Sequence, residues 1–286
     1  MHAVAATITL AIVTRDRADL FERFTLPSLA GLPSDGVEVL VVDQSSGDAT
    51  RSLAERVPGV SYLRSEPGLS RGRNLALAAA STPLLAFTDD DVEFGPGWLD
   101  GIREGFARDP RIGAVCGFGI DAAGRPVPGQ PAGLYTWPTN PFGLGHGFNL
   151  ALRRHVAVDV GAFDERLGAG AEFRSGEDSD MLYRVLRAGW TILLHDGITV
   201  VHHAWRHGRA ELRLHEGYGM GAAAQTAKHL RRGDRTAGRL ALREARGHAI
   251  TLARWTVKRN ARLAAIQLAW AAGFVRGFVR ALARRL

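Results

Sequence analysis

The fold of this chain is decided by the stretch Leu84-Leu85-Ala86-Phe87-Thr88-Asp89-Asp90-Asp91, an apolar run that ends in three consecutive carboxylates. Four apolar residues followed by a threonine are typical of a buried strand. In an open α/β sheet, ligands bind at the carboxyl ends of the strands, which is where the three acids would lie. Adjacent carboxylates repel one another unless a cation or water screens them, and hard oxygen ligands suit Mg²⁺ or Mn²⁺. The stretch therefore predicts either a metal site or a solvated acidic turn.

Strands and helices alternate in the residues that precede this stretch. Short β-rich runs occupy Thr7–Val13, Val37–Val42 and Val60–Arg64, with segments of helical length between them at Arg17–Ala30, Gly47–Val57 and Ser70–Ala80. Such alternation predicts βαβ units and a mostly parallel sheet, so the first ninety or so residues have the pattern of a Rossmann-like half.

The residues that follow are less regular. Asp121–Gly145 is rich in glycine and proline, and we expect it to form an irregular wall of a binding cleft. A helix is predicted near Ser179–Ala188, followed by two further apolar strands at Thr191–His195 and Ile198–His202.

The composition narrows the class of protein. With 286 residues, of which 46% are hydrophobic, the chain can bury a full core. Cys116 is the single cysteine, which excludes internal disulfides and fits a reducing compartment. The apolar start lacks a basic region and a cleavage site, and no apolar run is long enough to span a bilayer. We therefore expect a cytoplasmic protein.

The charge is distributed unevenly along the chain. From Lys228 to Leu286 there are fifteen Lys or Arg residues and two acids, so this tail carries +13 and the first 227 residues carry −6. A basic tail on a mildly acidic body indicates attraction to a polyanion. No recognised nucleic-acid motif accompanies the charge, so an anionic membrane surface is the better candidate than nucleic acid.

The tail predicts an amphipathic helix. Arginines recur every four residues on one face and large apolar residues lie along another: Arg276, Arg280 and Arg284, and Leu263, Ile266, Trp270, Phe274 and Phe278. This pattern fits a helix peripheral on the inner face of the cytoplasmic membrane, or equally one packed on the core of the body. Upstream, Gly217-Tyr218-Gly219-Met220-Gly221 predicts a mobile lid or a glycine-rich linker.

Two further segments suggest anion and nucleoside binding. Asp43 follows the run Val37–Val42, and an acid there can accept hydrogen bonds from a ribose hydroxyl or a base N–H, or can cap a turn. The segment Gly68–Asn74 opens a helix whose N–H groups and nearby arginines favour an anion, with Ser70 as a candidate N-cap.

Acidic and imidazole side chains recur later in the chain. Ser175-Gly176-Glu177-Asp178 has the spacing of a capping box, and a carboxylate held at a helix start is also a serviceable general base. His202-His203 ends a predicted strand, where adjacent side chains face opposite ways. At most one of the two histidines is therefore expected to bind a metal.

Because of the order and spacing of these motifs, the chain resembles a family 2 glycosyltransferase with the GT-A fold. The resemblance extends from about Thr7 to His203. The resemblance rests on the motifs above together with three further segments: Thr14-Arg15-Asp16-Arg17, Gly147-Phe148-Asn149-Leu150-Ala151-Leu152-Arg153-Arg154 and Gly189-Trp190. Asp43-Gln44-Ser45-Ser46 departs from the commoner Asp-Asp/Asn-Gly-Ser pattern of the family, which leaves the nucleotide open.

The resemblance implies a role for each motif. Residues that contact the donor substrate are expected to be Thr14, Arg15, Asp43, Ser70, Arg73, Asn74, Asp89 and Asp90. The divalent ion, Mn²⁺ or Mg²⁺, is expected on Asp89 and Asp91, with His202 favoured over His203 as a third ligand. The Glu177-Asp178 pair is expected to supply the catalytic base, which maps to Asp178.

The resemblance also implies an architecture and an activity. We expect an α/β GT-A domain at 1–205, with a nucleotide-sugar half at about 1–95 and an acceptor half at about 96–205, followed by a basic helical extension at 206–286. The implied activity is a metal-dependent inverting transfer from a nucleoside diphosphate-sugar to a glycan or lipid-linked acceptor, in the synthesis of a cell-surface polysaccharide or glycoconjugate. The alternatives are a catalytically inactive, membrane-associated relative and a sugar nucleotidyltransferase, although the latter class usually begins with a glycine-rich phosphate loop.

Overall fold

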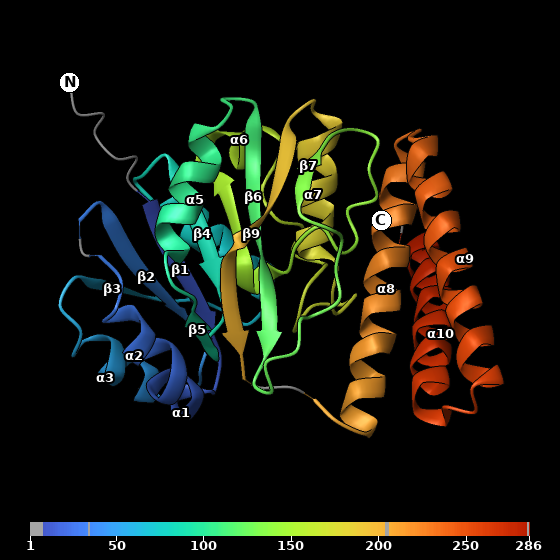
Figure 1. The fold of residues 1–286 in the computed structure, drawn as a ribbon, viewed down its shortest axis with the longest axis horizontal. Coiled ribbons are helices and arrows are strands. Elements are labelled where there is room, and N and C mark those ends of the chain that lie inside the picture. Colours follow the sequence, from blue (N-terminus) through green and yellow to red (C-terminus); the bar gives the residue numbers. More distant parts are fainter. Residues whose placement is uncertain (1–7, 34, 204–205, 285) are drawn as a thin grey trace. The chain divides into compact units, whose positions relative to one another are not determined.

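The computed structural model describes residues 8–33, 35–203, 206–284 and 286 (Figure 1). The chain divides into two compact units. The first comprises Met1–Phe163 and Asp178–Trp205, and the second comprises Asp164–Glu177 and Arg206–Leu286.

The first unit is built on a nine-stranded mixed sheet with the order β3-β2-β1-β4-β8-β6-β9-β5, and β7 pairs with β9. The strands are β1 (Ile8–Thr14), β2 (Val37–Asp43), β3 (Val60–Arg64), β4 (Leu84–Thr88), β5 (Val92–Phe94), β6 (Ile112–Asp121), β7 (Gly133–Tyr135), β8 (Leu150–Arg153) and β9 (Thr191–His202). The strands β3, β2, β1 and β4 are parallel neighbours, and β8 pairs antiparallel with both β4 and β6. The fold class predicted from the sequence is confirmed, with parallel pairing among β1, β2, β3 and β4 and again between β6 and β9.

Helices cover both faces of this sheet (Figure 1). They are α1 (Ala18–Leu20), α2 (Leu26–Leu29), α3 (Ala49–Ala54), α4 (Leu69–Ala79), α5 (Trp98–Ala107), α6 (Arg154–Asp159) and α7 (Glu177–Arg187), with a π-helical turn at Phe21–Thr25 and a 3₁₀ turn at Gly147–Asn149. Every residue of β1 and of β4 is buried, as continuous apolar runs in a doubly covered parallel sheet should be. Successive side chains of β1 alternate between the two faces: Ala11 packs with α4 and α7, and Ile12 packs with α5.

One prediction about this sheet is corrected. The runs predicted as two strands at Thr191–His195 and Ile198–His202 form the single strand β9. Its pairing with β6 shifts register between the Cys116–Leu194 pair and the Phe118–Thr199 pair. The intervening His195-Asp196-Gly197 is therefore a bulged segment inside one strand, although its polar composition suggested a turn.

The second unit is helical. Its long helices are α8 (Arg209–Arg231), α9 (Arg235–Val257) and α10 (Ala261–Ala283). The segment Asp164–Glu177 belongs with them: Phe173 and Leu167 pack against Ala224 and Ala281, and Lys228 Nζ lies 2.9 Å from Asp164 Oδ2. Across the described residues, none of the helices has the length and apolar character needed to cross a membrane.

Close helix contacts explain the glycine-rich segment of α8. A Cβ built on Gly219 would lie 2.0 Å from the carbonyl oxygen of Trp270, and one on Gly273 would lie 1.9 Å from that of Glu216. A Cβ on Gly221 would likewise meet the backbone of Ser175 at 2.3 Å. The segment 217–221 is therefore neither a lid nor a linker, because its glycines lie inside α8 and allow α10 and Ser175 to approach closely.

The apolar face predicted for the tail also lies within this unit. Ile266 and Trp270 are buried, Trp270 stacks on His248 of α9 at 3.7 Å, and Phe278 packs on the cluster around Phe173. Arg276 pairs with Glu216, and Arg280 donates to Glu172 at 2.8 Å. The aromatic face of α10 is therefore occupied by neighbouring helices and is not exposed to a membrane.

Candidate active site

The predicted donor residues gather at one edge of the sheet. Thr14, at the end of β1, pairs in register with Asp43, at the end of β2, while β4 runs parallel to β1 and leads into Asp89-Asp90-Asp91. Because these strands are parallel, their carboxyl ends share one edge, which is the usual ligand-binding edge of an open α/β sheet.

Asp89, Asp91 and His202 form the candidate metal centre. Each offers one ligand atom, and the three atoms lie within 4.8 Å of one another. His202 Nε2 is 3.4 Å from Asp91 Oδ1 and 3.7 Å from Asp89 Oδ2. The backbone fixes this meeting, because β5 pairs Val92 with His202 and the N–H of His203 donates to the carbonyl of Asp91 at 2.9 Å.

The chemistry of these three side chains fits a divalent cation. Asp91 is almost fully buried, and its Oδ1 has no hydrogen-bond partner among the described residues. An unsatisfied buried carboxylate oxygen is costly, and a cation would satisfy it. Two carboxylates and an imidazole are suitable ligands for Mn²⁺, and the carboxylates also suit Mg²⁺.

The two adjacent histidines face different surroundings. The ring of His203 stacks on Phe24 with a centroid distance of 3.9 Å, and its Nε2 lies 3.0 Å from Glu93 Oε1. Burial lowers the pKa of His202, but the hydrogen bond with Asp89 and the charges of Asp91 and Asp89 outweigh burial and leave that pKa above its usual value. Of the two imidazoles, it is therefore His202 that joins the acidic cluster.

Asp90 and Arg17 form a second layer beside this cluster. Arg17 Nη1 lies 2.9 Å from Asp90 Oδ1, and Nη2 of the same guanidinium donates to Asp91. The other Asp90 oxygen accepts from the Thr14 hydroxyl at 2.6 Å. Burial raises the pKa of Asp90 to about 7, with Arg17 and Thr14 opposing the shift. The structure thus places Asp90 and Thr14, both predicted to contact the donor, in contact with one another.

Asp43 is fully buried at the end of β2. Its Oδ1 accepts from the N–H of Ser45 at 2.8 Å, and its Oδ2 accepts from the Tyr62 hydroxyl at 2.8 Å, with Arg64 Nη1 3.6 Å away. Arg15, by contrast, is exposed and pairs with Asp16 at 3.5 Å. Tyr62 and Arg64 were not predicted from the sequence as site residues, although both lie in β3 directly beside β2.

The helix α4 contributes three of the predicted donor residues. Ser70 and Arg73 are buried, and the Arg73 guanidinium lies 5.7 and 5.6 Å from the ring centroids of Phe87 and Phe163, which contact each other edge to face. The amide of Asn74 pairs with the backbone of Phe163 in both directions, at 2.9 and 2.8 Å. Asn74 thereby binds the backbone of Phe163, where the first segment of this unit ends. The positive charge of Arg73 acts on the carboxylate of Asp89.

Asp178 lies in the first turn of α7. Its Oδ1 accepts from the N–H of Ser179 at 2.7 Å and its Oδ2 from the N–H of Gly147 at 3.1 Å. A Cβ on Gly147 would lie 2.1 Å from Arg73 Nη2, so the turn that carries this N–H also lies directly beside Arg73. The carboxylate is partly exposed, while Glu177 before it is buried. Asp180 instead forms a buried ion pair with Arg184 at 2.9 Å.

His146 interacts electrostatically with both Asp178 and His202. Burial lowers its pKa, the negative charge of Asp178 opposes that shift and the positive charge of His202 adds to it. These interactions place His146 within electrostatic reach of both the candidate base and the candidate metal centre. His146 was not identified from the sequence; it lies at the end of the glycine-rich wall, where no periodic pattern marks it.

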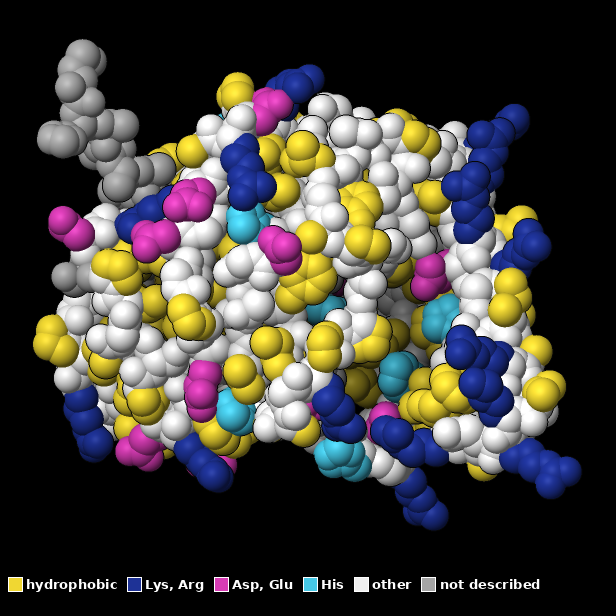
Figure 2. All heavy atoms as spheres, in the orientation of Figure 1, with side chains coloured by type: hydrophobic (Ala, Val, Ile, Leu, Met, Phe, Trp, Pro, Cys, Tyr) yellow, Lys and Arg dark blue, Asp and Glu magenta, His cyan; other side chains and the backbone are white. Residues whose placement is uncertain are grey.

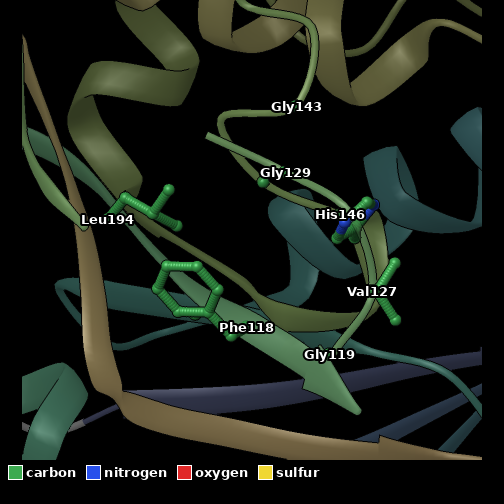
Figure 3. Close-up of a pocket in the computed structure, with 9 residues that line it drawn as sticks. Phe118, Gly119, Val127, Gly129, Gly143, His146 and Leu194 are labelled. Carbon is green, nitrogen blue, oxygen red and sulfur yellow. The ribbon is translucent and has the colours of Figure 1, made fainter. Parts of the chain in front are cut away.

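A small pocket adjoins His146 (Figure 3). Phe118 and Leu194 contribute from the sheet, and Val127 and His146 contribute from the segment 122–146. Five glycines complete its lining: Gly117, Gly119, Gly129, Gly143 and Gly145. The wall predicted from the sequence thus contains the short strand β7, and the part near His146 encloses this pocket.

Known proteins resemble the chain in both sequence and fold. Residues 9–159 match the family described as Glycosyl transferase family 2. The N-acetylglucosaminyl-diphospho-decaprenol L-rhamnosyltransferase of Mycobacterium tuberculosis is 28% identical over 238 residues, which cover 68% of this chain and 76% of that protein. The pre-mycofactocin glycosyltransferase of the same organism is 27% identical over 253 residues, or 80% of this chain and 49% of that protein.

The fold has solved counterparts as well. A mannosyltransferase from Pyrobaculum calidifontis, solved with GDP-Man and Mn²⁺, superposes with a TM-score of 0.67 over 95% of this chain and 87% of that chain, at 17% identity. At this identity the likeness concerns the fold. The family match extends over more than half of the chain and includes β4 with the three acids that follow it, whereas His202 lies beyond the match. The chain therefore belongs to glycosyl transferase family 2 and is a glycosyltransferase with the GT-A fold.

Proposed function

We propose that this protein transfers a sugar, with inversion, from a nucleoside diphosphate-sugar to an acceptor hydroxyl, and that the transfer depends on a divalent cation. The observation that carries the proposal is the cluster of Asp89, Asp91 and His202, in which the buried Asp91 Oδ1 lacks a hydrogen-bond partner among the described residues. The cluster lies at the sheet edge to which Asp43 also belongs.

Each part of the site has a role in this proposal. Asp89, Asp91 and His202 would hold the cation, which when bound supplies a Lewis acid for the charge that develops on the departing diphosphate. Asp43, whose carboxylate accepts from the Ser45 N–H and the Tyr62 hydroxyl, would accept a further hydrogen bond from the nucleoside. Arg73 adds positive charge beside the cluster, and Arg15 is exposed at the end of β1, where a phosphate could reach it.

The base is proposed to be Asp178. Two N–H donors hold its carboxylate in one orientation while leaving it partly exposed to an acceptor. A positioned carboxylate of this kind can remove the proton of the attacking hydroxyl. Glu177 is its buried neighbour in the first turn of the helix.

The acceptor is proposed to be a lipid-linked glycan or a related glycoconjugate. Support comes from the relative whose name specifies an N-acetylglucosaminyl-diphospho-decaprenol acceptor and which is 28% identical to this chain over 238 residues.

The experiment is a thermal-shift panel of UDP-, GDP- and dTDP-sugars, each with and without Mn²⁺. A ligand that binds only the folded state raises the melting temperature by mass action. We expect one nucleotide series to raise it in a metal-dependent manner, and Asp91→Ala to remove that dependence. Asp196→Asn, which changes a highly exposed acid of β9, is the matched control and should behave as wild type. If no donor shifts the melting temperature, the inactive-relative alternative replaces this proposal.

A further inference from the structure

The described part of the second unit exposes more large apolar side chains than its own packing explains. Seven exposed large apolar residues lie on α9 and α10, against two in the first unit: Leu242, Ile250, Val257, Leu268, Val275, Val279 and Leu282 against Leu134 and Val158. Exposure reaches 72% for Leu242 and 83% for Val257. Contiguous exposed apolar side chains on a folded protein mark an interaction surface.

These residues form a stripe on each helix. On α9, Leu242, Ile250 and Val257 are spaced by eight and seven residues, which keeps them on one side. On α10, the exposed residues 268, 272, 275, 279 and 282 alternate spacings of four and three. They lie opposite the face that carries Ile266 and Trp270, so this is a different surface from the aromatic face predicted from the sequence.

The helix α9 buries few of its own residues, although His248 near its middle stacks on Trp270 of α10. It has 23 residues, yet its buried residues are Ala237, Leu240 and Ala241, all in its first turns. Helices in proteins owe most of their stability to the packing of an apolar face. From Leu242 to Val257, α9 has such a face with no fully buried residue in it, which indicates that another surface covers it.

Charge identifies the kind of surface. Residues 235–286 contain twelve Lys or Arg residues and one acid, Glu244. Arg239, Arg243 and Arg246 are exposed on the same side of α9 as its apolar stripe, whereas Glu244 is half-buried and lies near His248. Figure 2 shows Lys and Arg side chains over α9 with hydrophobic side chains between them. A second copy of so basic a surface would repel the first.

The end of α9 adds an aromatic residue suited to an interface. Arg254 and Lys258 lie over the half-buried Trp255 ring, at 5.4 and 5.6 Å from its centroid. Tryptophan flanked by basic side chains is typical of the headgroup level of a bilayer. Binding of nucleic acid would involve the arginines, through its phosphates, but would not explain the exposed Leu and Val side chains.

From these observations we infer that the exposed faces of α9 and α10 dock on an anionic lipid bilayer. The leucines and valines enter the boundary between headgroups and acyl chains, and the arginines bind lipid phosphates. The surface belongs to the second unit and the proposed donor site to the first, and occupation of the surface requires neither donor nor acceptor.

The test is the partitioning of the full chain onto vesicles, measured by co-sedimentation over a lipid titration. Vesicles of equal parts phosphatidylglycerol and phosphatidylcholine are compared with pure phosphatidylcholine. We expect binding to the anionic vesicles that weakens as salt rises. The double variant Val257→Gln/Val275→Gln should bind about tenfold more weakly, because each side chain loses its apolar burial. Leu134→Gln/Val158→Gln makes the same exchange in the first unit and should bind as wild type.

A second pair of variants tests the charge. Arg239→Gln/Arg243→Gln/Arg246→Gln should weaken binding by at least about tenfold, since each basic residue near an anionic surface contributes measurably. Arg51→Gln/Arg56→Gln/Arg125→Gln removes three exposed arginines of the first unit and should not. Melting temperatures of all variants verify that they are folded.

Four results would overturn the inference. The first is no binding to anionic vesicles, and the second is equal losses in the test and control variants. The third is a dimer in sedimentation velocity that Val257→Gln/Val275→Gln dissociates, which would assign the face to a second copy. The fourth is salt-sensitive binding to duplex DNA without vesicle binding, which would assign it to nucleic acid.

Discussion

Arg17 holds two of the three acids that follow β4. Its guanidinium contacts Asp90 and Asp91 while remaining about one-third exposed. Without it, both buried carboxylates would lack their nearest positive charge. The residue therefore stabilises the cluster when no cation is present and competes with a cation for Asp91.

We predict that Arg17→Met lowers the free energy of unfolding by about 1–3 kcal/mol in metal-free buffer, because a partly buried ion pair is broken. Addition of Mn²⁺ should restore more stability to the variant than to wild type. Urea unfolding with and without Mn²⁺ measures both effects. Arg111→Met, which breaks an exposed pair with Asp109, is the control and should change little. Equal responses to Mn²⁺ in all three proteins would exclude this role.

A second prediction concerns Asp178. We expect Asp178→Asn to keep donor affinity within a few-fold of wild type and to reduce release of the nucleoside diphosphate by at least about a hundredfold, since a general base contributes that much or more. Calorimetric titration of the donor and a coupled release assay separate the two effects. Asp196→Asn serves as the exposed control. Turnover that survives in Asp178→Asn would remove this residue from the base role.

The sequence predicts site residues where they follow strands, and misses those that reach the site from elsewhere. Asp43 and Asp89–Asp91 could be located because a strand end fixes their position. The preference for His202 over His203 came from the family resemblance, and the structure places His202 in the cluster. The ion pair of Arg17 with Asp91 spans 74 residues, and no local pattern specifies it. The same holds for His146, which a long irregular segment brings near Asp178.

At the scale of elements, strands defined by continuous apolar runs were predicted closely and helix contacts were not. The sequence predicts β3 and β4 with the observed bounds. The bulge in β9 resembled a turn because polar residues and a glycine interrupt its apolar run. The glycines of α8 allow the close approach of neighbouring segments such as α10. The sequence of α8 alone does not show which segment packs against it.

The helix contact gives a third prediction. Gly273→Ala should lower the free energy of unfolding by about 2–3 kcal/mol, because the added methyl would overlap the Glu216 carbonyl. Gly247→Ala is the matched control: it adds the same methyl to a helix of the same unit where nothing lies within 4 Å. This control should raise stability by about 0.5–1 kcal/mol, as alanine favours helix over glycine. If the two substitutions have similar effects in urea unfolding, the close contact of α8 with α10 is refuted.

A fourth prediction concerns the segment that joins α8. The Lys228 ammonium and the Arg166 side chain outweigh burial and hold the pKa of Asp164 below its usual value. A depressed carboxyl pKa adds stability above the unfolded value near 4, and that stability is lost as pH falls through the folded value. Asp164→Asn should therefore cost about 2–4 kcal/mol at neutral pH, because it leaves Lys228 buried beside a neutral amide.

The pH profile provides the check on this ion pair. The difference in unfolding free energy between wild type and Asp164→Asn should shrink as the pH falls below about 4. Asp121→Asn, in an exposed turn with Arg125, should show a much smaller difference throughout. A difference for Asp164→Asn that is independent of pH would show that packing, and not charge, holds the segment.

In the whole molecule, the proposed catalytic residues and the proposed membrane surface belong to different units. The first carries the sheet edge, the acidic cluster and Asp178, and the second carries the basic helices with their exposed apolar stripes. Composition predicted the basic tail, and of the two alternatives left open for its aromatic face, membrane contact or packing, the structure shows packing among helices. A helical wheel cannot distinguish these cases, because a helix that packs on two neighbours and still exposes apolar residues is hydrophobic on more than one side.

We propose that Asp89, Asp91 and His202 bind the divalent cation on which sugar transfer depends. The most direct measurement is titration of Mn²⁺ in the presence of UDP, GDP or dTDP, with free Mn²⁺ followed by electron paramagnetic resonance. We predict that the wild type binds one Mn²⁺ per chain in the presence of one of these nucleotides. Binding of Mn²⁺ should weaken at least about tenfold in Asp91→Asn and in His202→Gln. It should be unchanged in Asp196→Asn. Equal Mn²⁺ binding by all four proteins, or none by the wild type with any nucleotide, would contradict it.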